Sequence, residues 1–97
     1  MAAAEVVIYT TKWCPYCVRA KQLLSTKKVD YKEIDVEERP DLRDWITKKS
    51  GQRTVPQIFV NGRALGGFTD IAALDQRGQL DPLLSRAREP SDPAVEL

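Results

Sequence analysis

The chain has two cysteines, and they stand three positions apart as Cys14 and Cys17 in the segment Cys-Pro-Tyr-Cys. Two thiols at this spacing can close a disulfide within one turn of a helix. The pair follows an apolar run at residues 6–9 and opens a helix-like stretch at residues 18–24, so Cys14 is expected where a strand leads into a helix. At a helix N-terminus, unpaired backbone N–H groups and the helix dipole stabilise negative charge. The sequence therefore predicts a thiol pKa for Cys14 within about 3.5–7.5, that of a reactive thiolate.

Two other uses of a cysteine pair fit the sequence less well. Zinc takes about four ligands. The chain has no histidine and no third cysteine, so we expect no bound metal. A structural disulfide that closes so short a loop gains little from chain entropy. Redox catalysis by Cys14 and Cys17 is therefore the leading interpretation.

Composition favours a small globular domain. The chain has 97 residues, 42% of them hydrophobic, and a formal net charge of +1. This charge indicates no nucleic-acid partner, and no apolar run approaches the length of a membrane span. The first five residues lack the basic and apolar regions of a secretory signal. We therefore expect a cytoplasmic protein, because a cysteine pair in a reducing compartment is typically catalytic. A form processed on entry to an organelle is the alternative.

The order of predicted elements indicates an α/β fold. Strands are expected at residues 6–10, 31–36, 57–60 and 63–66. Helices are expected at residues 15–28, from Pro40 to Gly51, from a cap at Thr69 or Asp70 to Gly78, and at residues 79–88. The first strand, first helix and second strand predict a parallel unit with a right-handed crossover.

Two turn signals refine this interpretation. Asn61-Gly62 between the last two strands predicts a type I′ hairpin. Residues 89–97 include Pro-Ser-Asp-Pro, which breaks regular structure, so we predict a domain at residues 1–88 followed by a flexible tail at 89–97.

Two further motifs could flank the thiols. Thr54-Val55-Pro56 directly precedes a predicted strand, where a proline marks a strand start or a special bond. A cis bond there would expose the Val55 backbone to an extended peptide, although only about 5–6% of such bonds are cis.

In the segment at residues 66–70, paired glycines allow close backbone approach, and the Thr69 and Asp70 amides could hold a carboxylate. An ordinary turn followed by a helix cap is the alternative for this segment.

Together these motifs resemble, in order and spacing, those of the glutaredoxin family, specifically its dithiol class. The resemblance covers residues 5–86, and residues 53–59 and 80–84 look especially like bacterial members. It implies a thioredoxin-like fold, with a four-stranded mixed sheet flanked by helices on both faces. The strands at residues 6–10 and 57–60 would be central, and the bond before Pro56 would be cis.

The resemblance also implies a glutathione-dependent thiol–disulfide oxidoreductase. Cys14 would attack the substrate sulfur, and Cys17 would resolve the mixed disulfide. Glutathione would be the co-substrate, protein disulfides and glutathionylated proteins would be the substrates, and the protein would act as a monomer. The resemblance assigns glutathione binding to Lys12, Tyr16, Arg43, Thr54, Val55, Pro56, Gly67, Phe68, Thr69 and Asp70.

Within that set, the resemblance gives separate roles to the ends of glutathione. The Val55 backbone would pair with the cysteinyl unit. Thr69 and Asp70 would bind the γ-glutamyl end, and Arg43 would bind the glycine carboxylate.

Two departures from the family pattern leave other functions open. Lys12 stands one residue nearer to the first cysteine than the lysine of many members, and Trp13 is more reminiscent of thioredoxin. One alternative is therefore a redoxin reduced by a thioredoxin-type flavoenzyme. The other is an iron–sulfur carrier that bridges two subunits through glutathione, which Pro15 and Cys17 both disfavour.

Overall fold

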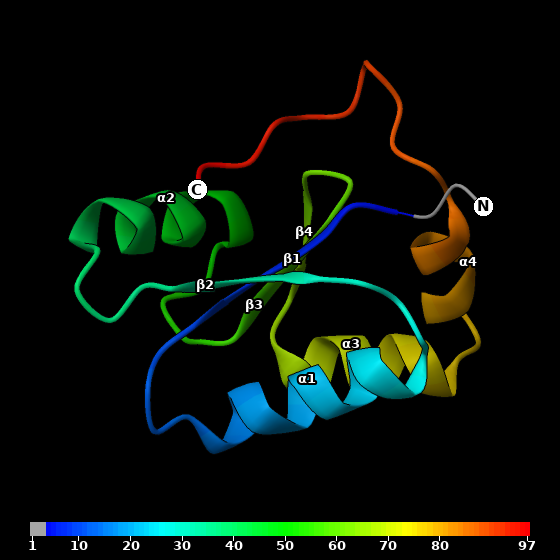
Figure 1. Ribbon diagram of the computed structural model, residues 1–97, viewed down its shortest axis with the longest axis horizontal. Helices are drawn as coiled ribbons and strands as arrows, with labels where there is room; N and C mark the ends of the chain where they lie inside the picture. The colour runs from blue at the N-terminus through cyan, green and yellow to red at the C-terminus, as the bar shows by residue number, and fades with distance from the viewer. Residues whose placement is uncertain (1–3) are drawn as a thin grey trace.

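The computed structural model describes residues 4–97, which fold around one four-stranded sheet (Figure 1). The strands are β1 (Val6–Thr10), β2 (Lys32–Asp35), β3 (Gln57–Val60) and β4 (Arg63–Gly66), and their order in the sheet is β2-β1-β3-β4. β1 runs parallel to β2 and antiparallel to β3, and β3 runs antiparallel to β4. The expected mixed sheet with β1 and β3 at its centre is confirmed.

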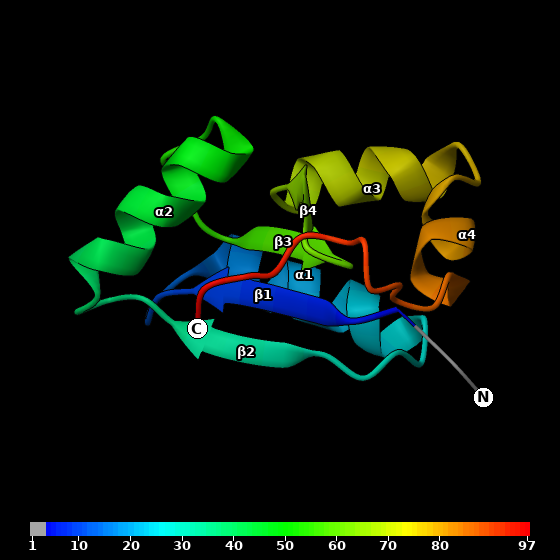
Figure 2. The same cartoon turned by 90° about the horizontal axis from the view of Figure 1, so that it is seen from above.

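Helices cover both faces of this sheet. They are α1 (Pro15–Thr26), α2 (Pro40–Ser50), α3 (Phe68–Gln76) and α4 (Leu80–Ser85). Figure 1 shows α1 and α3 on one side of the sheet and α2 with the C-terminal segment on the other. Figure 2 views the sheet from above, with the C-terminal segment crossing over it. This is the thioredoxin-like arrangement that the family resemblance implies.

The central strands are mostly apolar because they are buried on both faces, and Thr10 and Gln57 are the polar residues buried in them. Alternate side chains of a strand point to opposite faces. Val6 and Ile8 of β1 therefore join a core with α1, α3 and α4, whereas Val7 and Tyr9 join a second core beneath α2. β3 divides in the same way, since Phe59 belongs to the second core. The two cores hold β1 and β3 in place, the loop after β1 leads to Cys14 at the start of α1, and the loop before β3 carries Pro56.

Several predicted element boundaries are confirmed. Pro40 begins α2, and Gly51 ends it with a φ of 76°. Asn61 and Gly62 have φ values of 53° and 79°. Positive φ at both positions is the requirement of a type I′ turn. α1 and α4 end at Thr26 and Ser85, earlier than predicted, and β2 is one residue shorter at each end.

The predicted cap of α3 is wrong. The helix begins at Phe68, and its N-cap is Gly67 rather than Thr69 or Asp70. Asp70 is the third helical residue, and its Oδ2 accepts a hydrogen bond of 2.9 Å from the Gly67 N–H. A carboxylate at this position satisfies a free donor from within the first turn, as in a capping box.

The C-terminal segment packs back onto the domain. Glu96 accepts a hydrogen bond from the Tyr9 hydroxyl through its backbone carbonyl, and Val95 packs against the core beneath α2. Asp92 is buried and accepts a hydrogen bond of 3.0 Å from Arg86. The predicted boundary after residue 88 and the flexibility of residues 89–97 stay predictions, and these contacts provide a way to test them.

Candidate active site

The cysteine pair forms a disulfide at the start of α1. The Cα atoms of Cys14 and Cys17 are 5.1 Å apart. Cys14 is the N-cap of the helix and Pro15 is its first residue, as the sequence predicts. Cys17 is 2% exposed, whereas Cys14 is partly exposed. A substrate can therefore reach the sulfur of Cys14 but not that of Cys17.

The start of α1 directs a hydrogen-bond donor at Cys14. The Cys17 backbone N–H donates to Cys14 Sγ over 3.0 Å. Donors in the first turn of a helix favour a thiolate over a thiol. Cys14 is therefore placed to act as the nucleophile once the disulfide is reduced.

The loop before β3 lies beside the disulfide. The Val55–Pro56 bond is cis, which confirms the prediction made from the family resemblance. The carbonyl oxygen of Val55 is 3.8 Å from Cys14 Sγ. The backbone of this loop therefore borders the position where a substrate sulfur must bind.

A groove extends from this loop to the start of α3, and we call it the Tyr16–Asp70 groove. Its lining residues are Tyr16, Gln52, Thr54, Val55, Pro56, Gly67, Phe68, Thr69 and Asp70. The rings of Tyr16 and Phe68 stack with their centroids 6.2 Å apart, and the Arg19 guanidinium lies 5.5 Å from the Tyr16 ring centroid. All the residues assigned to glutathione from sequence lie in this groove, apart from Lys12 and Arg43.

Paired glycines allow close packing at the α3 end of the groove. Gly66 has a φ of 106°, and a Cβ atom there would overlap the Asp70 carboxylate. A Cβ atom on Gly67 would lie 3.3 Å from the carbonyl oxygen of Pro56, closer than nearly all such contacts. Small residues at both positions therefore let α3 approach the cis-proline loop.

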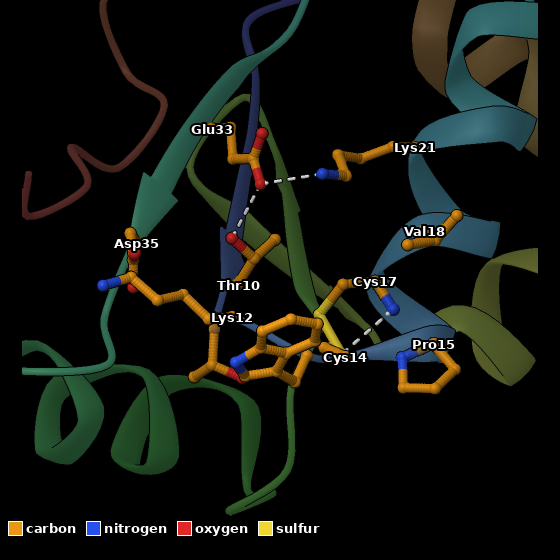
Figure 3. Close-up of a pocket in the computed structure, with 11 residues that line it drawn as sticks. Thr10, Lys12, Cys14, Pro15, Cys17, Val18, Lys21, Glu33 and Asp35 are labelled. Carbon is orange, nitrogen blue, oxygen red and sulfur yellow. Dashed lines mark hydrogen bonds and ion pairs between the residues drawn. A yellow bond between two sulfur atoms is a disulfide. The ribbon is translucent and has the colours of Figure 1, made fainter.

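Lys12 and Arg43 lie outside this groove. Lys12 lines a second cavity, which we call the Lys12 cavity (Figure 3). Its lining also includes Cys14, Trp13, Lys21 and Glu33. Arg43 lies on α2 and lines neither cavity. Their predicted contacts with glutathione stay predictions.

The Lys12 cavity has a polar wall. Figure 3 shows Glu33 between Thr10 and Lys21, and its Oε2 accepts hydrogen bonds of 2.8 Å and 3.0 Å from them. Trp13 borders the same cavity and is 97% exposed, with a φ of 55°. An aromatic ring beside the reactive sulfur is thus free to contact a partner.

Sequence reasoning missed two glutamines. Gln52 lines the Tyr16–Asp70 groove and donates to Asp70, and Gln57 is fully buried behind it. A polar residue at the start of an otherwise apolar strand, directly after Pro56, is the sequence signal by which Gln57 could have been found. Residues 4–97 include no group of three or more His, Cys, Asp or Glu side chains that could hold a metal ion. In the same range, no helix has the length and apolar character needed to cross a membrane.

An accessible sulfur next to a buried partner is suited to exchange, in which a thiolate attacks a disulfide and the second thiol resolves the product. The fold and this site define a thiol–disulfide oxidoreductase with a thioredoxin-like fold. The family model described as Glutaredoxin matches residues 6–65. The chain belongs to the glutaredoxin family.

Individual relatives agree with this assignment. The chain is 54% identical over 80 residues to a glutaredoxin of Pseudomonas aeruginosa. The matched residues cover 82% of this chain and 95% of the relative. The solution structure of a glutaredoxin from Brucella melitensis superposes with a TM-score of 0.78 at 44% identity, over 88% of this chain and 92% of that one. A crystal structure of a buckwheat glutaredoxin–glutathione complex superposes with a TM-score of 0.77 at 28% identity, over 84% of this chain and 76% of the other.

Proposed function

We propose that this protein is a glutathione-dependent oxidoreductase that reduces protein disulfides and protein–glutathione mixed disulfides. The observation that carries the proposal is the Tyr16–Asp70 groove, which begins beside Cys14 and ends at a carboxylate on a helix N-terminus. This geometry suits a peptide with a sulfur at one point and an ammonium and a carboxylate at its end. The buckwheat glutaredoxin in complex with glutathione supports the same ligand.

The proposed reaction uses one or both cysteines. The Cys14 thiolate attacks the glutathione sulfur of a mixed disulfide and forms a Cys14–glutathione disulfide, while the protein thiolate leaves. A second glutathione thiolate then attacks that disulfide, which releases oxidised glutathione and restores Cys14. With a protein disulfide, Cys17 displaces the substrate from Cys14, and two glutathione molecules later reduce the Cys14–Cys17 disulfide.

The activation of Cys14 is proposed to come from the backbone. The chain has no histidine, so no imidazole can act as a base. The Cys17 N–H and the N-terminus of α1 lie at the sulfur and favour its ionised form. Lys12, two residues before Cys14, is proposed to add a smaller contribution that solvent screens.

Glutathione is proposed to lie along the groove with its cysteinyl backbone against Val55. Thr69 and Asp70 would bind the γ-glutamyl end, with tyrosine and phenylalanine rings along the side of the groove. Arg43 would bind the glycine carboxylate from α2, and Lys12 is a cation in the cavity that Cys14 also lines.

One observation favours a second candidate function, reduction by a thioredoxin-type flavoenzyme. Trp13 is almost fully exposed directly before the nucleophile. A large exposed aromatic side chain is typical of protein contact surfaces. This candidate shares the cysteine chemistry and differs only in the reductant.

We also propose that the protein acts as a cytoplasmic monomer. In the described chain, the large exposed hydrophobic residues are Trp13, Tyr16, Val18 and Leu97. The first three border the disulfide, so they belong to the substrate surface rather than to a separate subunit interface. Both cysteines serve the reversible pair, which fits a reducing compartment.

A coupled assay tests the proposal. The protein is mixed with glutathione, glutathione reductase, NADPH and the mixed disulfide of cysteine and glutathione, and NADPH oxidation is followed. A parallel reaction replaces glutathione and its reductase with thioredoxin reductase. We expect activity in the first reaction, and activity only in the second would contradict glutathione dependence.

A further inference from the structure

Two glutamine side chains connect the cis-proline loop to Asp70. Gln57 is 0% exposed, and its Nε2 donates to the Thr54 carbonyl over 2.8 Å and to Gln52 Oε1 over 2.9 Å. Gln52 Nε2 in turn donates to Asp70 Oδ2 over 3.2 Å. These bonds form a continuous path from the backbone of the loop to the carboxylate at the start of α3, and we call this path the glutamine relay.

Along this path, the groups that donate and the groups that accept hydrogen bonds are fixed. The Thr54 carbonyl oxygen can only accept, so the Gln57 amide must turn its NH₂ group toward it. That same NH₂ group reaches Gln52, which must therefore present its oxygen to Gln57 and its NH₂ group to Asp70. A backbone carbonyl thus determines that Asp70 receives a donor rather than an acceptor.

The donors converge on one oxygen of Asp70. Oδ2 accepts from Gln52 and from the Gly67 N–H. Within residues 4–97, Asp70 Oδ1 makes no hydrogen bond, although Asp70 lines the Tyr16–Asp70 groove. The carboxylate is therefore fixed by one oxygen, and the other stays available to a ligand.

The buried amide of Gln57 leaves one of its own polar atoms without a partner among the described residues. The Oε1 atom of Gln57 is buried and has no hydrogen-bond partner among the described residues. A buried acceptor without a partner is unfavourable, and an apolar side chain of the same shape would avoid that cost. The amide is useful at this position for the two bonds that its NH₂ group donates.

We propose that Gln52 and Gln57 are positioning residues that prepare Asp70 to bind the ammonium group of the substrate peptide. The inference rests on the proposed glutathione dependence. Gln57 orients Gln52, Gln52 fixes Asp70 Oδ2, and Oδ1 receives the ammonium. Because Gln57 also donates to the Thr54 carbonyl, the same pair of amides fixes the position of Asp70 relative to the cis-proline loop.

Steady-state kinetics with the cysteine–glutathione mixed disulfide test this proposal. Gln52→Met and Gln57→Met retain side-chain length but cannot donate, and each should raise KM by about two- to tenfold, the range for a lost hydrogen bond. The rate at which iodoacetamide alkylates Cys14 should remain unchanged, because neither glutamine contacts the sulfur. Gln76→Met, at an exposed position at the end of α3, is the matched control and should retain the original KM.

Two further variants separate positioning from general destabilisation. Gln52→Glu keeps the size of the side chain but places a carboxylate beside Asp70, so its KM should exceed that of Gln52→Met. In an Asp70→Asn background, Gln52→Met should change KM by less than twofold, because the relay then has no charge to position. Gln52 is half-buried, so its variants carry the test even if Gln57→Met fails to fold.

The outcomes distinguish the inference from the function on which it rests. If Asp70→Asn raises KM and the Gln52 variants do not, the relay is wrong and the glutathione groove stands. If Asp70→Asn also leaves KM unchanged, the groove assignment fails, and the relay fails with it. An equal rise in the Gln76→Met control would likewise overturn the proposal.

Discussion

The Sγ atom of Cys14 lies 3.8 Å from the carbonyl oxygen of Val55, although 41 positions separate the two residues. The sheet causes this contact. β1 and β3 are antiparallel neighbours, and Tyr9 near the end of β1 pairs with Gln57 at the start of β3. The loop that leaves β1 and the loop that enters β3 therefore meet at one edge of the sheet, and a substrate bound to Cys14 finds backbone groups beside its sulfur.

This placement predicts a low pKa for the Cys14 thiol. In a reduced Cys17→Ser variant, titration of the thiolate absorbance should give a pKa well below the free-thiol value of about 8.5, because the helix N-terminus favours the anion. Lys12→Ala should raise that pKa only slightly, since water screens an exposed lysine. A pKa equal to that of a free thiol would contradict the contribution of the helix.

Charge reversal tests the residues proposed to bind the two ends of glutathione. Asp70→Lys should raise KM for a glutathione mixed disulfide by tenfold or more, because a desolvated charge-assisted contact contributes about 1.5–3 kcal/mol. Arg43→Glu should raise KM less, because Arg43 lies outside the Tyr16–Asp70 groove.

Alkylation of Cys14 by neutral iodoacetamide is the control for both charge variants. Its rate should remain close to that of the parent protein in each of them. Unchanged KM values in both variants would show that the glutathione groove is assigned to the wrong residues.

Local signals in the sequence were sufficient for much of the fold. Pro40 and Gly51 bracket α2, and Asn61-Gly62 fixes the hairpin, because these residues restrict their own backbone. The cis bond at Pro56 was different, since the residues alone made it improbable and only the family resemblance predicted it.

Features that depend on distant contacts were not predictable in this way. The sequence predicts Thr69 or Asp70 as the cap of α3, but the observed cap is Gly67, which lies against the cis-proline loop. The glutamine relay also joins residues that become neighbours only in the folded chain. The Tyr9–Glu96 bond, which spans 87 positions, could not be read from the local polarity of residues 89–97.

Tyr9 reports on whether the C-terminal segment stays packed. Burial, followed by the nearby Glu96 and Glu5 carboxylates, raises the pKa of Tyr9 to about 12 from the ordinary value of 10.0. A chain truncated after Arg88 loses Glu96 and exposes the hydroxyl, so the pKa should fall toward 10.0. Titration of tyrosinate absorbance, with Tyr9→Phe as the difference control, measures this change. An unchanged titration after truncation would support a tail that is flexible, as predicted from sequence.

The same pKa shift predicts how stability changes at high pH. The folded-state pKa of Tyr9 is raised, so its contribution to stability is fully present below the unfolded value of 10.0 and is lost as the pH rises toward about 12. The difference in the free energy of unfolding between the parent protein and Tyr9→Phe should therefore shrink over this interval. Urea titrations at several pH values provide the measurement.

The lowered pKa of Asp92 predicts how the stability of the fold changes at low pH. A backbone hydrogen bond from Glu89 and the Arg86 guanidinium hold the pKa of the Asp92 carboxyl below its usual value of 3.8. For a lowered pKa, the contribution to stability is present above the unfolded value and is lost as the pH falls through the folded one. Asp92→Asn should therefore be less stable than the parent at neutral pH, and the two should converge below pH 3.8. A constant difference down to strong acid would contradict the role of this carboxylate.

The last prediction assigns different roles to the two cysteines. Reduction of a glutathione mixed disulfide requires one attacking thiol, and Cys14 is the accessible one, since Cys17 is 2% exposed. Cys14→Ser should therefore abolish both activities, because Cys17 is then the only thiol left and it is buried. Cys17→Ser should retain most deglutathionylation and lose much of the activity toward protein disulfides, for which the second thiol releases the substrate. Both assays are run on the same preparations, with urea titrations to show that each variant is folded. If Cys17→Ser loses deglutathionylation as completely as Cys14→Ser, the one-thiol path is wrong, and both substrate classes depend on the Cys14–Cys17 disulfide.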